Sequence, residues 1–216
     1  MHVHFPRWST ALARSAVYGG PVVLAACLAA LMVYVRTPDF EESQDPVIQP
    51  VQFDHRHHVA DDHIDCRFCH QTVDRAASAG YPATEVCMGC HSQVWNGAPI
   101  LARVRESYFT DKSVPWKRVH RLPQFVYFNH AIHVNKGVGC VECHGRVDRM
   151  PLVEQVAPLT MSWCLGCHRH PLGHLRPKAE VTDMAWRPKG DAAAEQKALA
   201  ARYQVHTRVD CTTCHR

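Results

Sequence analysis

The cysteines and histidines of this sequence recur in a spacing that can do redox chemistry. The pattern Cys-x-x-Cys-His occurs five times, and these pentads contain ten of the eleven cysteines. In such a pentad the two thiols bond covalently to one haem, and the adjacent histidine binds its iron. Zinc sites and disulfides are the alternatives, but zinc does not require a histidine directly after the second cysteine every time. The spacing therefore predicts five covalently bound c-type haems. Their attachment cysteines are Cys66, Cys69, Cys87, Cys90, Cys140, Cys143, Cys164, Cys167, Cys211 and Cys214, and their proximal histidines are His70, His91, His144, His168 and His215.

A second pattern, Phe-x-His-x-x-His, occurs twice and supplies what the pentads lack. Each iron takes a sixth ligand, and a histidine in that place gives a low-spin bis-histidine electron-transfer centre. Histidines three residues apart lie on one face of a helical turn, from which they can cap two neighbouring haems. His57 and His63 have no counterparts in the second copy and are expected to be surface residues. The predicted distal ligands are His55, His58, His130 and His133.

These four histidines leave one of the five haems without a distal ligand, and three residues compete for that place. Met161 lies three residues before the fourth pentad, and a methionine ligand would raise the potential of its haem relative to bis-histidine ligation. Ordinary packing is the alternative role for this methionine. His120 lies ten residues before His130 and can reach back over the second copy. His206 lies five residues before the fifth pentad, where an exposed loop histidine is the alternative. The sequence leaves the choice open.

Alignment of the two Phe-x-His-x-x-His elements reveals an internal repeat. Phe53–Val59 matches Phe128–Val134 at an offset of 75, and the pentads that follow match at offsets of 74 and 77. Such repeats predict supersecondary units that stack on one another. We therefore expect a two-haem unit at about 53–91 and again at about 128–168, with a fifth haem at 206–216.

Composition limits the fold that can hold these haems. A chain of 216 residues is too short to wrap five haems in separate domains, so porphyrin must supply much of the core. Each pentad is expected to open or lie in a short helix. The clearest helix outside the N-terminal segment is Asp191–Tyr203, with Asp191 as N-cap. The predicted fold class is mainly α with much irregular structure. A net charge of +4, which haem propionates would offset, gives no indication of nucleic-acid binding.

The N-terminal segment is predicted to be a membrane anchor. Arg14 and Arg36 bracket 21 uncharged residues, which as a helix would span about 31 Å, close to the ~30 Å hydrocarbon core of a bilayer. Arg7 and Arg14 precede this run, so the positive-inside rule puts the N-terminus in the cytoplasm and the haem region outside. A cleaved secretory signal would need a shorter apolar core. Leu24–Cys27 resembles a lipoprotein cleavage site, but the apolar run continues for eight residues past Cys27.

These segments predict the domain organisation. Residues 1–36 form the cytoplasmic N-terminus and transmembrane anchor, 37–52 a polar linker with three prolines, and 53–216 the pentahaem cytochrome c domain. The expected location is the bacterial inner membrane, crossed once, with the haem domain on the periplasmic side. Whether Cys27 is lipidated stays open.

Taken together, these motifs resemble a known family. They are the N-terminal anchor, the two Phe-x-His-x-x-His elements, CMGCH at Cys87–His91, the stretch Val119–Gly145, LTMSWCLGCHR at Leu159–Arg169 and a terminal CTTCHR. They are similar to the pentahaem cytochrome c subunit of bacterial alternative complex III, a quinol:electron-acceptor oxidoreductase. The resemblance implies an iron–sulfur subunit, integral membrane subunits and a monohaem cytochrome c as partners. It implies a conductor of electrons from a quinol-oxidising complex to a monohaem cytochrome c or a terminal oxidase, rather than a catalyst on its own.

Two other functions fit part of the pattern. A stand-alone membrane-anchored multihaem quinol dehydrogenase also has one anchor and several pentads, but its quinol-oxidising haem should sit at the membrane surface. Here the first pentad begins about 30 residues beyond the predicted span, past an extended linker. A multihaem enzyme that converts nitrite or hydroxylamine needs a haem with an open site, often attached through an altered pentad, and all five pentads here are standard. The order of the haems in space, their potentials, the quinone and the final acceptor are not determined by the sequence.

Overall fold

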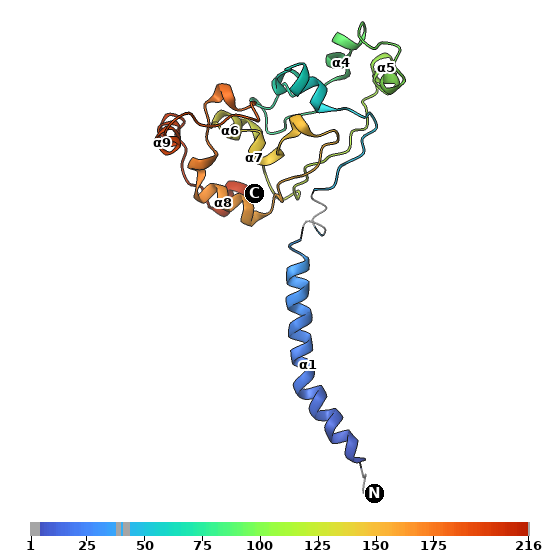
Figure 1. Ribbon diagram of the computed structural model, residues 1–216, viewed down its shortest axis with the longest axis vertical. Coiled ribbons are helices and arrows are strands. Elements are labelled where there is room, and N and C mark those ends of the chain that lie inside the picture. Colours follow the sequence, from blue (N-terminus) through green and yellow to red (C-terminus); the bar gives the residue numbers. More distant parts are fainter. Residues whose placement is uncertain (1–4, 38–39, 41–43, 216) are drawn as a thin grey trace. The chain divides into compact units, whose positions relative to one another are not determined.

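The computed structural model describes residues 5–37, 40 and 44–215, and the chain divides into two compact units, Met1–Ser43 and Gln44–Arg216. The first unit is built on one long helix, α1 (Arg7–Tyr34), which begins directly after Pro6 (Figure 1). A proline fits just before a helix because its ring fixes φ and its missing N–H is not needed there. At 28 residues α1 is about 42 Å long.

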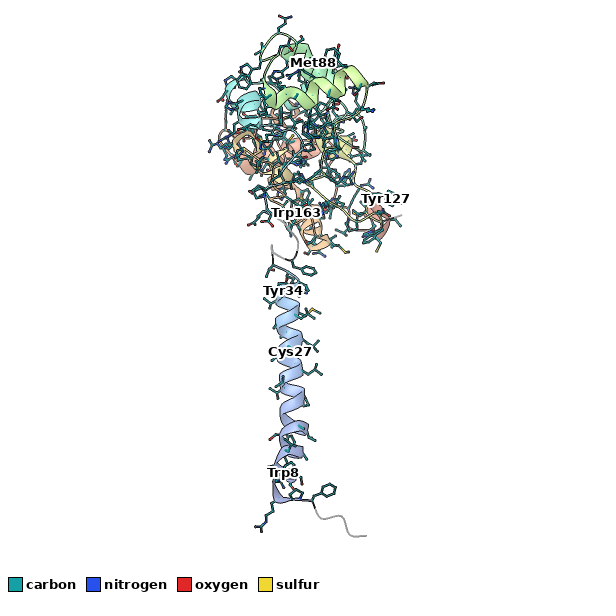
Figure 2. The ribbon with its side chains drawn as sticks, turned by 90° about the vertical axis from the view of Figure 1, so that its right-hand side faces the viewer. Trp8, Cys27, Tyr34, Met88, Tyr127 and Trp163 are labelled. Atoms are coloured by element: carbon teal, nitrogen blue, oxygen red, sulfur yellow. The ribbon has the colours of Figure 1, made fainter. Side chains whose placement is uncertain are left out.

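The helix α1 differs from the predicted span mainly at its N-terminal end. It starts eight residues before Ser15, and Pro21 lies inside it without ending it. Its apolar side chains project into the surroundings along its length, with Trp8 and Tyr34 near the two ends and Cys27 between them (Figure 2). Within the described part of the chain, α1 is the one helix whose length and composition suit a membrane crossing. Residues 1–4 of the predicted cytoplasmic segment lie outside the described residues.

The second unit consists of short helices joined by irregular segments. No strand occurs among the described residues, and β-pairing there is confined to one isolated antiparallel bridge between Val138 and Leu175. This confirms a mainly helical fold with much irregular structure. The α-helices are α3 (Cys66–Cys69), α4 (Thr84–His91), α5 (Ala102–Thr110), α6 (His130–Asn135), α7 (Val141–His144), α8 (Met161–Arg169), α9 (Ala192–Arg202) and α10 (Cys211–Cys214). The other helical turns are η1 (Arg56–Asp61), which is π-helical, and the 3-10 turns η2 (Pro99–Leu101), η3 (Val147–Arg149), η4 (Pro171–His174) and η5 (Lys178–Glu180).

The α9 helix shows how local sequence sets these elements. Its alanine-rich run is a good helix former, and the Asp191 carboxylate accepts hydrogen bonds from the backbone N–H groups of Ala193 and Ala194. The predicted helix and its N-cap are confirmed.

The side-chain core of the second unit is small. Nine apolar side chains are buried among the described residues, too few for a unit of this length to be held by side-chain packing alone. One cluster joins Val51, Met88 and Val104 near α4 and α5. Large apolar side chains such as Phe68 and Met161 are exposed. A core completed by porphyrin accounts for the small number of buried apolar side chains.

The segment predicted as a linker is partly built into the second unit. Backbone N–H groups of Gln44 and Val47 donate to the carbonyls of Gln155 and Val153, at 2.7 and 3.1 Å. Gln49 exchanges two hydrogen bonds of 2.9 Å with the backbone of residue 117. Residues 44–52 are therefore extended but anchored. Residues 38–39 and 41–43 of the predicted linker lie outside the described residues.

Candidate haem-binding sites

Every pentad lies on or beside a short helix. Helices α3, α7 and α10 are single turns formed by the pentads themselves, and in α4 and α8 the pentad follows a short N-terminal turn. Two cysteines three residues apart on a helical turn point to the same side, as attachment to one porphyrin edge requires. All eleven cysteines are free thiols. Among the described residues no group of three or more histidine, cysteine or acidic side chains could hold a metal ion. Paired thiols on one turn with a histidine beside them therefore suit attachment to haem.

Four of the five proximal histidines share one hydrogen-bonding arrangement. Their Nδ1 atoms lie 2.8 to 3.1 Å from a backbone carbonyl oxygen, which can only accept, so Nδ1 must carry the proton. The Nε2 lone pair is then left for a metal, and the hydrogen bond fixes the ring orientation. The pairs are His70 with Gly80, His91 with Val94, His168 with Arg208 and His215 with Phe125.

The fifth proximal histidine, His144, has a different partner. Its Nδ1 lies 3.2 Å from Nε2 of His120, so an imidazole takes the place of the carbonyl. Burial, together with the neighbouring His120 and His130, lowers the pKa of His144 to about 3. Burial likewise lowers the pKa of His120 to about 4. Both rings are therefore neutral at physiological pH, and neutral imidazole is the form that binds metal.

The two Phe-x-His-x-x-His elements place their rings almost identically. The phenylalanine meets the first histidine edge-on, with centroids 4.7 Å apart in both copies. It stacks on the second histidine at 4.4 Å in the first copy and 4.5 Å in the second. In both copies Nδ1 of the second histidine donates to the carbonyl four residues earlier, at 3.1 Å for His58 and 2.8 Å for His133. The second histidine of each element therefore also presents Nε2.

Three of the predicted distal histidines face a pentad histidine across a similar gap. Ring centroids are 6.1 Å apart for His58 with His91, 6.1 Å for His133 with His168 and 6.3 Å for His130 with His144. Imidazole nitrogens bind metals at about 2 Å, so two rings on opposite sides of one metal have centroids about 6 Å apart. The residues present therefore fit an iron held between each pair.

His55 is the remaining histidine of the two elements. Burial, together with the nearby His70 and His58, lowers its pKa to about 4. Its Nδ1 is buried without a hydrogen-bond partner. A buried neutral imidazole next to the first pentad suits a metal ligand.

The candidates for the fifth distal ligand do not converge on His215. The rings of His120 and His144 are 4.2 Å apart, too close for a metal between them. Met161, the first residue of α8, is 64% exposed, and His206 is exposed as well. His215 lies beside Phe125, at 5.8 Å. His57, expected at the surface, is exposed and pairs with Asp61 at 3.0 Å.

One group near the third pentad was missed by sequence reasoning. Glu142, inside the pentad, accepts hydrogen bonds from His174 at 2.7 Å and from the buried Arg176 at 2.9 Å. Arg176 also stacks over Trp186 and donates to the carbonyl of Asp183. No spacing rule connects these residues, which lie more than thirty positions apart. They anchor the third pentad to the segment that follows α8.

Comparison with known proteins shows what part of the chain is similar to. Residues 126–216 match the family described as cytochrome c7 and related cytochrome c. This matched part of the second unit, which contains the third, fourth and fifth pentads, is thus similar to cytochromes c of that family. Over 102 residues, 47% of this chain, the sequence is 37% identical to the menaquinone reductase multiheme cytochrome c subunit of Nitratidesulfovibrio vulgaris (strain Hildenborough). The aligned region covers 48% of that relative, so the chain spans about half the length of the curated protein it matches.

Proposed function

We propose that this chain is a membrane-anchored pentahaem c-type cytochrome. It conducts electrons from a quinol-oxidising membrane complex to a monohaem cytochrome c or a terminal oxidase. The observation that carries the proposal is the set of three imidazole pairs 6.1–6.3 Å apart, each joining a pentad histidine to a Phe-x-His-x-x-His histidine. An iron with two histidine ligands has no open position for a substrate, and such centres suit electron transfer without bond chemistry.

The ring pairs support a ligand assignment for three of the five haems, and the buried His55 near His70 supports a fourth. In the first repeat, His55 serves the haem of the first pentad and His58 the haem of the second. In the second repeat, His130 serves the third haem and His133 the fourth. For the fifth haem, Met161 and His206 remain the candidates, because His120 is engaged with the proximal ligand of the third.

The protein's own residues set the properties of each centre. Haem, when bound, supplies one-electron chemistry at its iron. Backbone carbonyls hold the Nδ1 protons of His70, His91, His168 and His215, which keeps each Nε2 directed to the metal. Burial keeps His144 neutral. These contacts fix the ligands in advance, so that little rearrangement accompanies a change in iron charge.

The helix α1 supports an anchoring role. Its length suits a membrane crossing, and Trp8 and Tyr34 near its ends are residues favoured at membrane interfaces. The haem unit would then lie on the periplasmic side of the bacterial inner membrane. The proposed partners are an iron–sulfur subunit, integral membrane subunits and a monohaem cytochrome c. The curated relative, which is a subunit of menaquinone reductase, supports a complex of this kind.

Purification in mild detergent tests this proposal. Full-length chain carrying an affinity tag is extracted from membranes, the intact mass counts its haems, and mass spectrometry identifies the proteins that co-purify. We expect five haems, retention in the membrane fraction after a salt wash, and an iron–sulfur subunit among the partners. A soluble chain that begins after α1 would show that α1 is a cleaved signal. A chain with fewer haems would contradict the pentahaem assignment.

A second candidate function is electron transfer in the opposite direction, toward quinone. The name of the curated relative, menaquinone reductase, favours it. Rapid mixing of the purified complex with a menaquinol analogue separates the two directions. Haem reduction by the quinol supports the main proposal, whereas oxidation of pre-reduced haems by the quinone, without the reverse reaction, supports the second. Quinol oxidation by the isolated chain would instead support a stand-alone quinol dehydrogenase.

A further inference from the structure

The first and third pentads are neighbours although the second lies between them in the sequence. The side chains of Cys66 and Cys140 lie close to each other. Residues 181 and 182 tie the two pentads together from one side. The Thr182 hydroxyl donates to the N-cap carboxylate of Asp65 at 2.8 Å, and the N–H of Cys140 donates to the carbonyl of residue 181 at 2.9 Å.

The element before the third pentad reinforces this contact. Helix α6 docks on the loop that follows the first pentad. Both Nδ1 and the backbone N–H of His130 donate to the carbonyl of Ala77, at 2.9 and 3.1 Å. The Asn135 side chain donates to the carbonyl of Asp74 at 2.7 Å. The proposed distal ligand of the third haem is therefore oriented by the loop of the first.

The other neighbours are set by shared elements. The first and second pentads share the element at Phe53–Val59, where the ring of His58 faces His91 at 6.1 Å. The third and fourth pentads share the element at Phe128–Val134, where His130 faces His144 at 6.3 Å and His133 faces His168 at 6.1 Å. Each pair of pentads is therefore joined by one short element.

The fifth pentad joins the fourth. Nδ1 of His168 donates to the carbonyl of Arg208, three residues before the fifth pentad, at 2.8 Å. The backbone N–H of residue 127 donates to the carbonyl of Cys214 at 2.8 Å, so the chain end packs on the start of the second repeat.

From these contacts we infer that the haems form one row in the order second, first, third, fourth, fifth. This inference rests on the proposed pentahaem function and adds the path that the electrons follow from haem to haem. Electrons enter and leave through the second and fifth haems, and the first haem is internal. Figure 1 shows α4, which carries the second pentad, at one end of the haem unit beside α5, and α8 with the C-terminus at the other, with α6 and α7 between them.

The order changes which haems exchange electrons directly. In a row that followed the sequence, the second haem would have two neighbours, the first and the third. In the inferred row it has one neighbour, the first, because it is terminal. A change confined to the second haem therefore separates the two arrangements.

The axial variant His58→Met provides that change in the full-length protein within its complex. A methionine ligand raises the potential of the second haem, so this haem is reduced earlier and its added electron lowers the apparent potential of any neighbour. Spectroelectrochemical titration, with each haem followed by its electron paramagnetic resonance signal, is expected to show two potentials changed, those of the second and first haems. His57→Met, on the same turn but exposed and paired with Asp61, is the matched control and is expected to change none. A third potential changed, that of the third haem, would overturn the order.

A direct measurement does not depend on the variant folding. In a cryo-electron microscopy map of the haem-loaded complex, the iron of the first pentad is expected to lie closer to that of the third than the iron of the second does. The reverse ordering would overturn the inference while leaving the pentahaem function standing. Fewer than five haems in the map would instead contradict the proposed function.

Discussion

The two Phe-x-His-x-x-His elements carry the same ring geometry on different backbones. In both, the ring distances between phenylalanine and histidines agree to within 0.1 Å. Yet the first element continues as the π-helical turn η1, and the second as the α-helix α6. The histidine positions are therefore the feature common to both copies, and the helix type is not. A function that needs the imidazoles in fixed places tolerates either backbone.

A local difference in sequence explains the two backbones. In the second copy the Asn129 side chain accepts from the N–H of Ile132 at 3.2 Å, the usual N-cap of an α-helix. In the first copy, Asp54 occupies the equivalent position, and its carboxylate is hydrogen-bonded to Arg56. It accepts from the backbone N–H of Arg56 at 2.9 Å and from the guanidinium at 2.7 to 3.1 Å. The equivalent of Arg56 is Ala131, which has no such group.

A difference in surroundings explains the other contrast between the copies. His130 donates through Nδ1 to Ala77, in the loop after the first pentad, whereas Nδ1 of His55 is buried without a partner. No pentad precedes His55 in the chain, so no equivalent loop exists to receive it. The matched rings of the two elements therefore lie in different surroundings.

The largest expected effect comes from removing a proposed distal ligand in each copy. His133→Met and its equivalent His58→Met replace an imidazole that faces a pentad histidine at 6.1 Å. We expect each variant to raise one midpoint potential by on the order of 0.1 V, a fraction of the ~0.8 V that axial ligands span. A methionine–iron charge-transfer band should accompany the change in the absorption spectrum.

The two copies should respond alike if their matched rings have matched roles. A shift in one variant only would break the equivalence of the copies. An unchanged spectrum in both would contradict the ligand assignment. His57→Met is the control for a methionine placed on the same turn, and it is expected to leave all five potentials unchanged.

A smaller effect is expected from the hydrogen bond at Nδ1 of the proximal histidine, which has a different partner in the first and third pentads. His70 donates to a backbone carbonyl, whereas His144 contacts the side chain of His120, which mutation can remove. A hydrogen bond to Nδ1 raises the basicity of an imidazole ligand, and a more basic ligand favours the oxidised iron. His120→Phe should therefore raise the potential of the third haem by tens of millivolts, which is on the order of 1 kcal/mol. His120→Gln, whose side-chain oxygen can still accept the hydrogen bond, should bring the potential most of the way back to the wild-type value.

The same pair of variants tests whether His120 is itself an axial ligand. Loss of an axial ligand in His120→Phe would give a high-spin haem, visible by electron paramagnetic resonance and by carbon monoxide binding. That outcome would replace the hydrogen-bonding role with ligation. A low-spin spectrum with a shifted potential supports the role assigned here.

Local spacing predicted the features that depend on neighbouring residues. The pentads, the helix at Asp191–Tyr203 and the equivalence of Phe53 with Phe128 all follow from contacts within a few positions. The position of Arg176 against Glu142 and the contact between Cys66 and Cys140 join distant segments. They depend on how distant segments of the second unit pack together, and the spacing of cysteines along the sequence does not predict that packing. The prediction places the N-terminal edge of the span at Arg14, whereas α1 begins at Arg7, because a helix can continue past a charged residue whose side chain reaches the interface.

A still smaller effect is expected from the phenylalanines, and it should be equal in the two copies. Each ring stacks on one histidine and meets another edge-on, and such aromatic pairs contribute about 0.5–1.5 kcal/mol beyond the area they bury. Phe53→Leu and Phe128→Leu should each lower the midpoint of urea unfolding, followed by loss of the low-spin haem spectrum. Unequal losses would show that the two phenylalanines contribute unequally to stability despite their shared ring geometry.

The smallest effect tests the origin of the backbone difference. The side-chain hydrogen bond from Arg56 lowers the pKa of Asp54 to about 2, against an unperturbed 3.8. A carboxyl group with a lowered pKa adds stability that is fully present above about pH 4 and is lost as the pH falls toward 2. Asp54→Asn, which installs the residue of the second copy, should therefore lower the free energy of unfolding by less than about 1 kcal/mol at neutral pH, since the ion pair is exposed. This loss should stay constant from about pH 7 to pH 5 and shrink below pH 4.

The double variant Asp54→Asn with Arg56→Ala makes the turn match the second copy, and hydrogen exchange at residues 59–62 should then report α-helical rather than π-helical protection. Protection unchanged from the wild type would show that packing around the first pentad, and not this ion pair, imposes the π-helical turn.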